Sequence, residues 1–364
     1  MYALIISVLL ISAAAAVLAA LLVIAEHFFA DYGLCMLMIN DKEEETVEGG
    51  SSLLSILNSR DIFIPSACGG KGTCGLCKVR VLEGGGPLLP TEEPYLDITE
   101  QEENIRLSCQ VKVREDIRIE IPEDLLSVQE YRAVCTLIED LTHDVKRFSF
   151  RLEEPSVIDF VPGQYIQLLA PEYEKSTEAV YRAYSIASDP SDSSSADLII
   201  RLVPGGICTT YCFEYLKEGD EVTMTGPFGE FRLSDTENDM IWIAGGSGMA
   251  PFVSILHHMR NIKSRRKAVY YFGANRIEDL FLTQEMKEFE QELAGFSFVP
   301  VVFDPESEWD GETGLVTEAA GRNHADLSGT EGYLCGSPGM IDASVSVLTD
   351  TGMNSDMIYY DKFA

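Results

Sequence analysis

The sequence predicts a protein of several parts: an apolar helix, a small α+β unit, an antiparallel β-barrel and a parallel α/β sheet. Three observations lead to this expectation. The 364 residues exceed what one ordinary hydrophobic core accommodates. Residues 1–25 carry no charged side chain. Beyond them, three stretches differ in how strand-like and helix-like segments alternate. We expect the parts to cover residues 1–25, 34–124, 125–235 and 236–364.

The N-terminal run YALIISVLLISAAAAVLAALLVIA predicts a single membrane-spanning helix. At about 1.5 Å per residue, this run can cross a hydrocarbon core of about 30 Å. A cleaved signal peptide is the alternative, because alanine-rich segments offer cleavage sites, although no lysine or arginine precedes the run. The first lysine or arginine after it is Lys42, so charge does not decide the orientation of the helix.

The next part has the pattern of a small α+β unit. Residues 34–40 (LCMLMIN) alternate as a strand does, and residues 52–61 have the leucine and isoleucine spacing of a helix. The segment CKVRVLEGG is a short strand closed by glycines. Residues 105–121 read as two strands around a turn at Glu115–Asp116. Strands around one helix in about ninety residues predict this fold class.

The remaining parts differ in their connections. From about Leu125, roughly six short strands are separated by turn signals, which predicts an antiparallel barrel. From Met240, strands such as MIWIAGG and KAVYYFG alternate with helical segments such as LTQEMKEFEQEL. Strands that alternate with helices predict a parallel sheet.

Composition excludes some classes of function. The formal net charge is −32 and the pI about 4.4, so a nucleic-acid partner is not expected. The nine cysteines are odd in number and three of them crowd one loop, which argues against a disulfide framework and for a reducing compartment. Cys35, Cys135, Cys208 and Cys212 are expected to be buried structural residues, and His257 and His258 to pack or face solvent.

The loop CGGKGTCGLC (68–77) carries the strongest chemical signal. Cys68, Cys74 and Cys77 have the spacing C-x5-C-x2-C, and Cys109 follows alone on an expected strand. Four thiolates hold a [2Fe–2S] cluster, and the glycines let the loop wrap it closely. Structural zinc also takes four cysteines, usually as two close pairs, and is the alternative.

Two further segments suggest nucleotide binding. RAYS (182–185) lies at the end of an expected strand, and GGICTTYCFEYL (205–216) opens a helix with Thr209 and Thr210 in its first turn. GGSGMAP (245–251) lies between a strand and a helix, where glycines admit a pyrophosphate to the helix N-terminus. CGSP (335–338) follows another strand, which places Cys335 at the carboxyl edge of the sheet; a buried strand-end thiol is its alternative reading.

Together these motifs resemble the ferredoxin–NADP⁺ reductase superfamily with an added N-terminal [2Fe–2S] domain of the ferredoxin (β-grasp) type. The order SACGGKGTCGLCKVRV, LLPTE, LSCQV, RAYSIA, GPFGEF, GGSGMAP, DPESEWDGETGLV and DKFA resembles, within it, the F subunits of Na⁺-translocating NADH:quinone oxidoreductases. Oxygenase reductases, by contrast, typically show C-x4-C-x2-C and no anchor.

The resemblance implies roles for particular residues. The cluster ligands would be Cys68, Cys74, Cys77 and Cys109. FAD would be contacted by Arg182, Tyr184, Ser185, Thr209 and Thr210. The nicotinamide nucleotide would lie against Gly245, Gly246, Gly248, Cys335 and Gly336, and Phe363 would cover the flavin ring. Tyr184 and Cys335 would be the catalytic residues.

Electron counting completes the expected mechanism. NADH gives up two electrons as a hydride, whereas a [2Fe–2S] cluster takes one, so a flavin is needed between them. The resemblance implies NADH dehydrogenase activity, with electrons passing to other membrane subunits and indirectly to quinone. Because NADH must be reached from the cytoplasm, we expect a single-pass protein of the inner (cytoplasmic) membrane with its domains on the cytoplasmic side. A stand-alone anchored reductase and a non-enzymatic electron carrier are the alternatives.

Overall fold

The computed structural model describes residues 12, 17–18, 32–66, 68–122, 125–126, 128–305 and 308–363. The helix expected over residues 1–25 lies outside this part of the chain, apart from Ser12, Val17 and Leu18. No helix built from the described residues has both the length and the apolar character needed to cross a membrane. The chain divides into two compact units, which we call the N-terminal unit (Met1–Ser127) and the C-terminal unit (Val128–Ala364).

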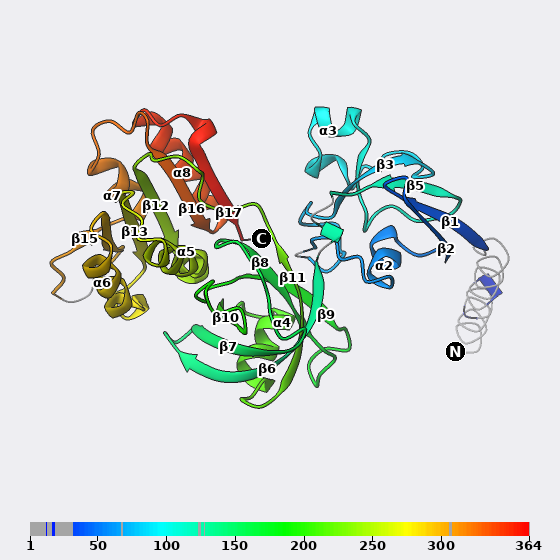
Figure 1. Cartoon of the computed structure of the whole chain (residues 1–364), viewed down its shortest axis with the longest axis horizontal. Coiled ribbons are helices and arrows are strands. Elements are labelled where there is room, and N and C mark those ends of the chain that lie inside the picture. The colour runs from blue at the N-terminus through cyan, green and yellow to red at the C-terminus, as the bar shows by residue number, and fades with distance from the viewer. Residues whose placement is uncertain are drawn as a thin grey trace, which may run out of the picture. The chain divides into compact units, whose positions relative to one another are not determined.

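The N-terminal unit contains a five-stranded sheet in the order β2-β1-β5-β3-β4 (Figure 1). Its elements are β1 (Leu34–Ile39), β2 (Glu43–Glu48), α2 (Leu53–Asn58), β3 (Lys78–Glu83), α3 (Ile98–Glu102), β4 (Ile105–Leu107) and β5 (Ile117–Glu120). β1 and β5 are parallel, and the other pairs are antiparallel. This arrangement confirms the α+β class expected for this part of the sequence.

Apolar spacing explains these elements. In β1, Cys35, Leu37 and Ile39 face the core while Leu34 and Met36 are exposed, as the alternation in the sequence predicts. Helix α2 begins after Ser52, whose side chain accepts a hydrogen bond from the amide of Ser55 and caps the first turn. The helix is shorter than the predicted 52–61.

The first half of the C-terminal unit is a barrel. Its elements are β6 (Gln129–Asp140), β7 (Val145–Glu154), β8 (Tyr165–Ala170), β9 (Val180–Ser185), β10 (Ser195–Arg201), α4 (Ile207–Thr210), the π-helix η3 (Tyr211–Tyr215) and β11 (Glu221–Phe228). All pairs are antiparallel, in the order β10-β7-β6-β11-β8-β9. A bridge between Ile186 and Leu198 joins the two ends of this order, so the sheet closes on itself.

The second half is a parallel sheet in the order β15-β14-β13-β12-β16-β17 (Figure 1). Its strands are β12 (Met240–Gly245), β13 (Ala268–Ala274), β14 (Phe296–Val302), β15 (Glu312–Thr313), β16 (Glu331–Gly336) and β17 (Ile358–Lys362). Its helices are α5 (Ala250–Asn261), α6 (Thr283–Glu292), α7 (Val316–Arg322) and α8 (Pro338–Asp350). Every strand pair is parallel, as predicted from the alternation of strands and helices.

Helices cover both faces of this sheet. Along β12, Trp242 packs with Phe252 of α5 on one face, and Ile243 belongs to the core with Ala319 of α7 and Ile341 of α8 on the other. A strand buried on both sides needs apolar residues at every position, which explains the unbroken run MIWIAG. The strand order reverses between β12 and β16, and ligands bind at such a switch point in open parallel sheets.

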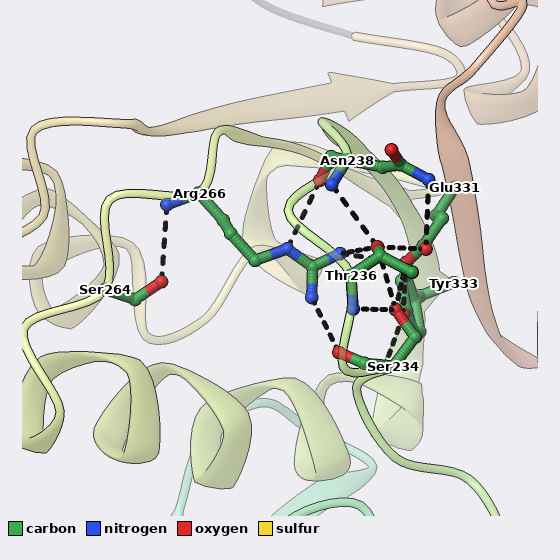
Figure 2. Close-up of polar contacts among 7 residues, drawn as sticks. All are labelled: Ser234, Thr236, Asn238, Ser264, Arg266, Glu331 and Tyr333. Atoms are coloured by element: carbon green, nitrogen blue, oxygen red, sulfur yellow. Dashed lines mark hydrogen bonds and ion pairs between the residues drawn. The ribbon is translucent and has the colours of Figure 1, made fainter.

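A buried polar cluster fixes the coil between the barrel and the parallel sheet (Figure 2). Arg266 donates to the carboxylate of Glu331 at 2.8 Å and to the carbonyl of Ser234 in the coil at 3.0 Å. Ser234 and Thr236 donate in turn to Glu331, and so does Tyr333 at 2.7 Å. Burial alone would raise the pKa of Glu331, but these hydrogen bonds and the guanidinium hold it below its usual value.

Candidate functional site

The four cysteines of the predicted cluster lie in the N-terminal unit as two pairs. The Cys74 thiol donates to the sulfur of Cys68 at 3.4 Å, and Cys77 interacts with Cys109. Cys109 lies in a turn directly after β4, not on a strand as predicted, because the β3–β4 ladder ends at Leu107. Within each pair one sulfur favours the thiolate: Cys74 lowers the pKa of Cys68 to about 3, and Cys77 lowers that of Cys109 to about 7.

Two pairs of thiols suit a two-iron cluster. A [2Fe–2S] cluster takes four thiolates, two on each iron. The two thiol pairs match this donor set in number and kind. The ligand assignment itself stays a prediction.

Backbone and side chains shape the loop around these sulfurs. Positive φ angles, which residues other than glycine rarely adopt, occur in this loop at Gly69, Gly70, Gly72 and Gly75. The buried Arg106 bonds the buried carboxylate of Glu92 at 2.6 Å and three carbonyls of residues 85–87. Glu92 also accepts from the amide of Leu107 at 2.9 Å. This pair anchors the strand that leads into Cys109.

The RAYS segment forms the end of β9 in the barrel. Arg182 donates to the carbonyl of Tyr181 at 2.7 Å. The hydroxyl of Tyr184 is buried, and within the described chain no hydrogen-bond partner satisfies it. Burial, reinforced by nearby Cys208 and Cys212, raises the pKa of Tyr184 well above its usual value, so its hydroxyl stays a neutral donor. An orphaned buried donor at this position fits a bound group with acceptor atoms, such as FAD.

The two threonines expected at the FAD pyrophosphate, Thr209 and Thr210, do not lie at the start of a long helix. They lie at the end of α4, whose helical path continues as the π-helix η3. Thr209 is buried, and its hydroxyl donates to the carbonyl of Val203 at 3.2 Å and accepts from the amide of the same residue. Its hydroxyl is therefore engaged in the turn that precedes the helix. Thr210 is less buried, and its side chain interacts with Tyr173.

The predicted nicotinamide-nucleotide residues meet at the switch point. Gly245 ends β12, and Gly246 and Gly248 belong to the 3-10 helix η4 (Gly246–Met249) that leads into α5. Cys335 and Gly336 end the neighbouring strand β16. A Cβ atom at Gly248 would lie 2.3 Å from the carbonyl oxygen of Cys335, so the turn and the strand touch through a position that only glycine fills. Such a cradle fits a nucleotide at the carboxyl ends of the strands.

Cys335 is a fully buried thiol. None of its surface is exposed, and burial raises its pKa well above the ordinary value. It is therefore a neutral thiol and not a reactive thiolate. Its burial agrees with the alternative reading made from the sequence, and its predicted catalytic role is not settled by this geometry.

The C-terminal strand brings Phe363 and an unpredicted acid to the same edge. The amide of Phe363 donates to the carbonyl of Gly336 at 2.9 Å. Asp361 lies beside Cys335 in the β16–β17 ladder, and Ser185 of the RAYS segment donates to its carboxylate at 3.4 Å. Burial raises the pKa of Asp361 to about 6. The only sequence feature that could have drawn attention to Asp361 is that it is a single acidic residue within the strand IYYDK.

Arg201 is a second residue that the motifs did not single out. It ends β10, and its Nη1 atom lies 3.5 Å from the position of a Cβ at Gly246. Its Nε atom donates to Asp144 at 2.7 Å, and half of its side chain is exposed. The barrel thus places a guanidinium beside the glycine turn, where a pyrophosphate would benefit from positive charge.

Three domain families match the chain. A 2Fe-2S iron-sulfur cluster binding domain matches residues 37–114, an oxidoreductase FAD-binding domain residues 133–233, and an oxidoreductase NAD-binding domain residues 242–346. The expected cofactors, a [2Fe–2S] cluster, FAD and NADH, are thereby confirmed at the level of the domains.

Two solved structures resemble nearly the whole chain. One is the Amycolatopsis cytochrome P450 reductase GcoB, with a TM-score of 0.74 and 28% identity over 90% of this chain and 98% of the other. The second is a ferredoxin reductase in carbazole 1,9a-dioxygenase, with a TM-score of 0.70 and 26% identity over 91% and 99%.

Curated relatives are more similar in sequence. The F subunit of the Na(+)-translocating NADH-quinone reductase of Pseudomonas aeruginosa strain UCBPP-PA14 is 34% identical over 90% of both chains. Its counterpart in Neisseria gonorrhoeae is 35% identical over 90% of this chain and 91% of its own. Because this similarity spans all three cofactor domains, the chain belongs to the family of F subunits of the Na⁺-translocating NADH-quinone reductases.

Proposed function

We propose that this chain is the NADH-oxidising, electron-input subunit of a membrane-bound, Na⁺-translocating NADH:quinone reductase. The observation that carries the proposal is the meeting of Gly248 with Cys335 at the switch point, in a chain that also holds an FAD domain and an iron–sulfur domain with four cysteines of the predicted cluster. Similarity to the F subunit of P. aeruginosa over 90% of the chain supports it.

The residues divide the work as follows. NADH binds at the carboxyl ends of β12 and β16, against Gly245, Gly246, Gly248, Cys335 and Gly336. FAD bound to the barrel would supply the conversion of a two-electron donor into single electrons, which a one-electron cluster requires. The flavin is held by a set of barrel residues that comprises Arg182, Tyr184, Ser185, Thr209 and Thr210. The cluster is held by Cys68, Cys74, Cys77 and Cys109.

Three side chains define the environment of the transfer. Cys335 contributes a neutral, buried thiol at the end of β16, which would not compete as a nucleophile beside the nicotinamide. Tyr184 offers its unpartnered hydroxyl to the flavin. Phe363, held by the carbonyl of Gly336, shields the flavin ring until the nicotinamide displaces it. Hydride transfer needs no side chain to act as acid or base.

Residues 1–25 anchor the chain in the inner (cytoplasmic) membrane as a single span, with the domains on the cytoplasmic side where NADH is found. Their uncharged composition supports the anchor. One spanning helix forms no ion path, so Na⁺ transport and quinone reduction belong to other membrane subunits.

A stand-alone membrane-anchored NADH:acceptor reductase is the second candidate. The observation that favours it is the near-complete overlap with a cytochrome P450 reductase and with a ferredoxin reductase of a dioxygenase. The C-x5-C spacing of the cluster loop counts against an oxygenase partner.

The deciding experiment is gentle detergent extraction of native membranes, followed by purification through this chain. Several polytopic subunits in fixed stoichiometry, with NADH–quinone activity, are the result expected of the sodium-translocating complex. The chain alone, yellow-brown and bleached by anaerobic NADH, would establish the stand-alone reductase. A colourless chain without flavin or iron would contradict both.

A further inference from the structure

Ser108 is a fully buried residue beside the predicted cluster. It follows the last residue of β4 and directly precedes Cys109. Its amide donates to the carbonyl of Cys77 at 2.8 Å, and its carbonyl accepts from the amide of Leu54 in α2 at 3.0 Å. Both backbone groups are thus fixed, and none of the residue's surface is exposed.

The hydroxyl of Ser108 has no hydrogen-bond partner among the described residues. A buried hydroxyl left in this state costs free energy, so it calls for a ligand or a function. The bond from the Ser108 amide to the Cys77 carbonyl continues the β3–β4 register one pair beyond Lys78–Leu107, so Ser108 and Cys77 lie opposite each other. Opposite residues of an antiparallel pair carry their side chains on the same face. The hydroxyl therefore lies on the face that carries the Cys77 sulfur.

Two other polar side chains near the sulfurs are already engaged. The hydroxyl of Ser66 accepts from the amide of Gly70 at 2.9 Å. Gln110 donates to the Cys109 sulfur at 3.6 Å while its carbonyl accepts from Thr91 at 3.1 Å. Ser108 differs from both, because its hydroxyl is buried and unpartnered while the residue lies opposite a predicted ligand.

We propose that the Ser108 hydroxyl donates a hydrogen bond to the Cys77 sulfur of the bound cluster and raises the cluster's reduction potential. The cluster gains negative charge on reduction, so a fixed donor stabilises the reduced form more than the oxidised form. Ser108 thereby favours transfer of electrons from the flavin to the cluster. This inference deepens the proposed function and rests on it, since it requires Cys77 to be a cluster ligand.

The test compares Ser108→Thr with Ser108→Val in the full-length protein, purified with flavin and cluster. These two side chains have nearly the same shape and differ in the hydroxyl. The midpoint potential of the cluster is measured by redox titration monitored by electron paramagnetic resonance. We expect Ser108→Val to shift the midpoint to a more negative value and Ser108→Thr to stay close to wild type.

A matched control is Ser254→Ala. Ser254 is also fully buried with an unpartnered hydroxyl, but it lies in α5 of the C-terminal unit. Its substitution should leave the cluster midpoint unchanged. With limiting anaerobic NADH, Ser108→Val should reduce its flavin at the wild-type rate and leave a smaller fraction of the cluster reduced.

An unchanged midpoint in Ser108→Val with a full complement of iron would overturn the proposal. So would a variant that assembles no cluster with valine but does with threonine, because the hydroxyl would then be needed to build the cluster and not to tune it. Wild-type protein without iron or a cluster signal would contradict the proposed function itself, which is a separate result.

Discussion

Gly248 and Cys335 touch so closely that a Cβ atom at Gly248 would lie 2.3 Å from the Cys335 carbonyl oxygen. The contact joins the turn after β12 to the end of β16, the two strands between which the sheet reverses its order. Backbone atoms cannot move aside as a flexible side chain does. The residue at position 248 therefore decides whether the turn can pack closely against the end of β16 and leave room for a nucleotide.

The first prediction concerns this contact. Gly248→Ala should lift the turn away from β16, weaken NADH binding at least tenfold and destabilise the protein by about 1–3 kcal/mol, as overpacking does. NADH titration and thermal unfolding measure the two effects. The control is Gly339→Ala in the first turn of α8, where a Cβ would meet nothing within 4 Å. Equal NADH affinity in both variants would contradict the proposed nucleotide site.

The second prediction concerns the Cys335 thiol. Cys335→Ala should slow flavin reduction by anaerobic NADH, because the predicted role of the thiol is to position the nicotinamide. Stopped-flow absorbance measures the rate. Cys135→Ala is the control, since Cys135 is equally buried but lies in the barrel core. If Cys335→Ala reduces its flavin at the wild-type rate, the role assigned to Cys335 is wrong.

The third prediction concerns pH. Burial raises the pKa of Asp361 from 3.8 to about 6. Between these two pH values the folded protein therefore holds a proton on Asp361 that the unfolded chain has already released. Stability from this group is full below about pH 4 and falls as pH rises to about 6, by at most about 3 kcal/mol. Above pH 6 it no longer changes. Urea unfolding from pH 4 to 7 should show this loss in wild type relative to Asp361→Asn, and parallel curves would refute it.

The fourth prediction concerns the buried polar cluster around Arg266 and Glu331 (Figure 2). Glu331→Gln should destabilise the protein by about 3–5 kcal/mol, because it leaves the Arg266 guanidinium buried without its counter-charge. Denaturant unfolding provides the measurement. Glu312→Gln removes one of the two acidic partners of the exposed Arg322 and should cost at most about 1 kcal/mol. Similar losses in the two variants would show that burial of the Arg266–Glu331 pair does not matter.

The sequence was sufficient for features that depend on local pattern. The unbroken apolar run of β12 and the glycines after it predicted both a buried parallel strand and the turn at its end. Features that depend on strand register could not be predicted from the sequence. Asp361 lies beside Cys335 only because β17 pairs with β16 in one particular register, which no local pattern specifies. Arg201 reaches Gly246 through the packing of two different sheets, which is a tertiary property.

The cysteine loop illustrates the same division. Its spacing and glycines predicted three cluster ligands from local pattern, because these are local requirements of a wrapped cluster, and the ligand assignment stays a prediction. Cys109 was expected on a strand but lies in a turn, because the ladder of β3 and β4 ends two residues earlier, at Leu107. Similarly, the helix expected within residues 205–216 begins as α4 and continues as a π-helix, a change of winding that composition does not reveal.

The last prediction tests the assignment of four cysteines as cluster ligands. Cys109→Ser should abolish the visible absorption of the cluster, because the cluster loses one of its four predicted thiolate ligands, while flavin reduction by NADH continues in the separate C-terminal unit. Cys35→Ala is the matched control: Cys35 is buried in the core of the same N-terminal unit, so the cluster should assemble. Iron content and absorbance measure assembly. A cluster built in full without Cys109 would sink the four-thiol assignment, and loss of flavin reduction along with the cluster would mean that the two units do not function independently.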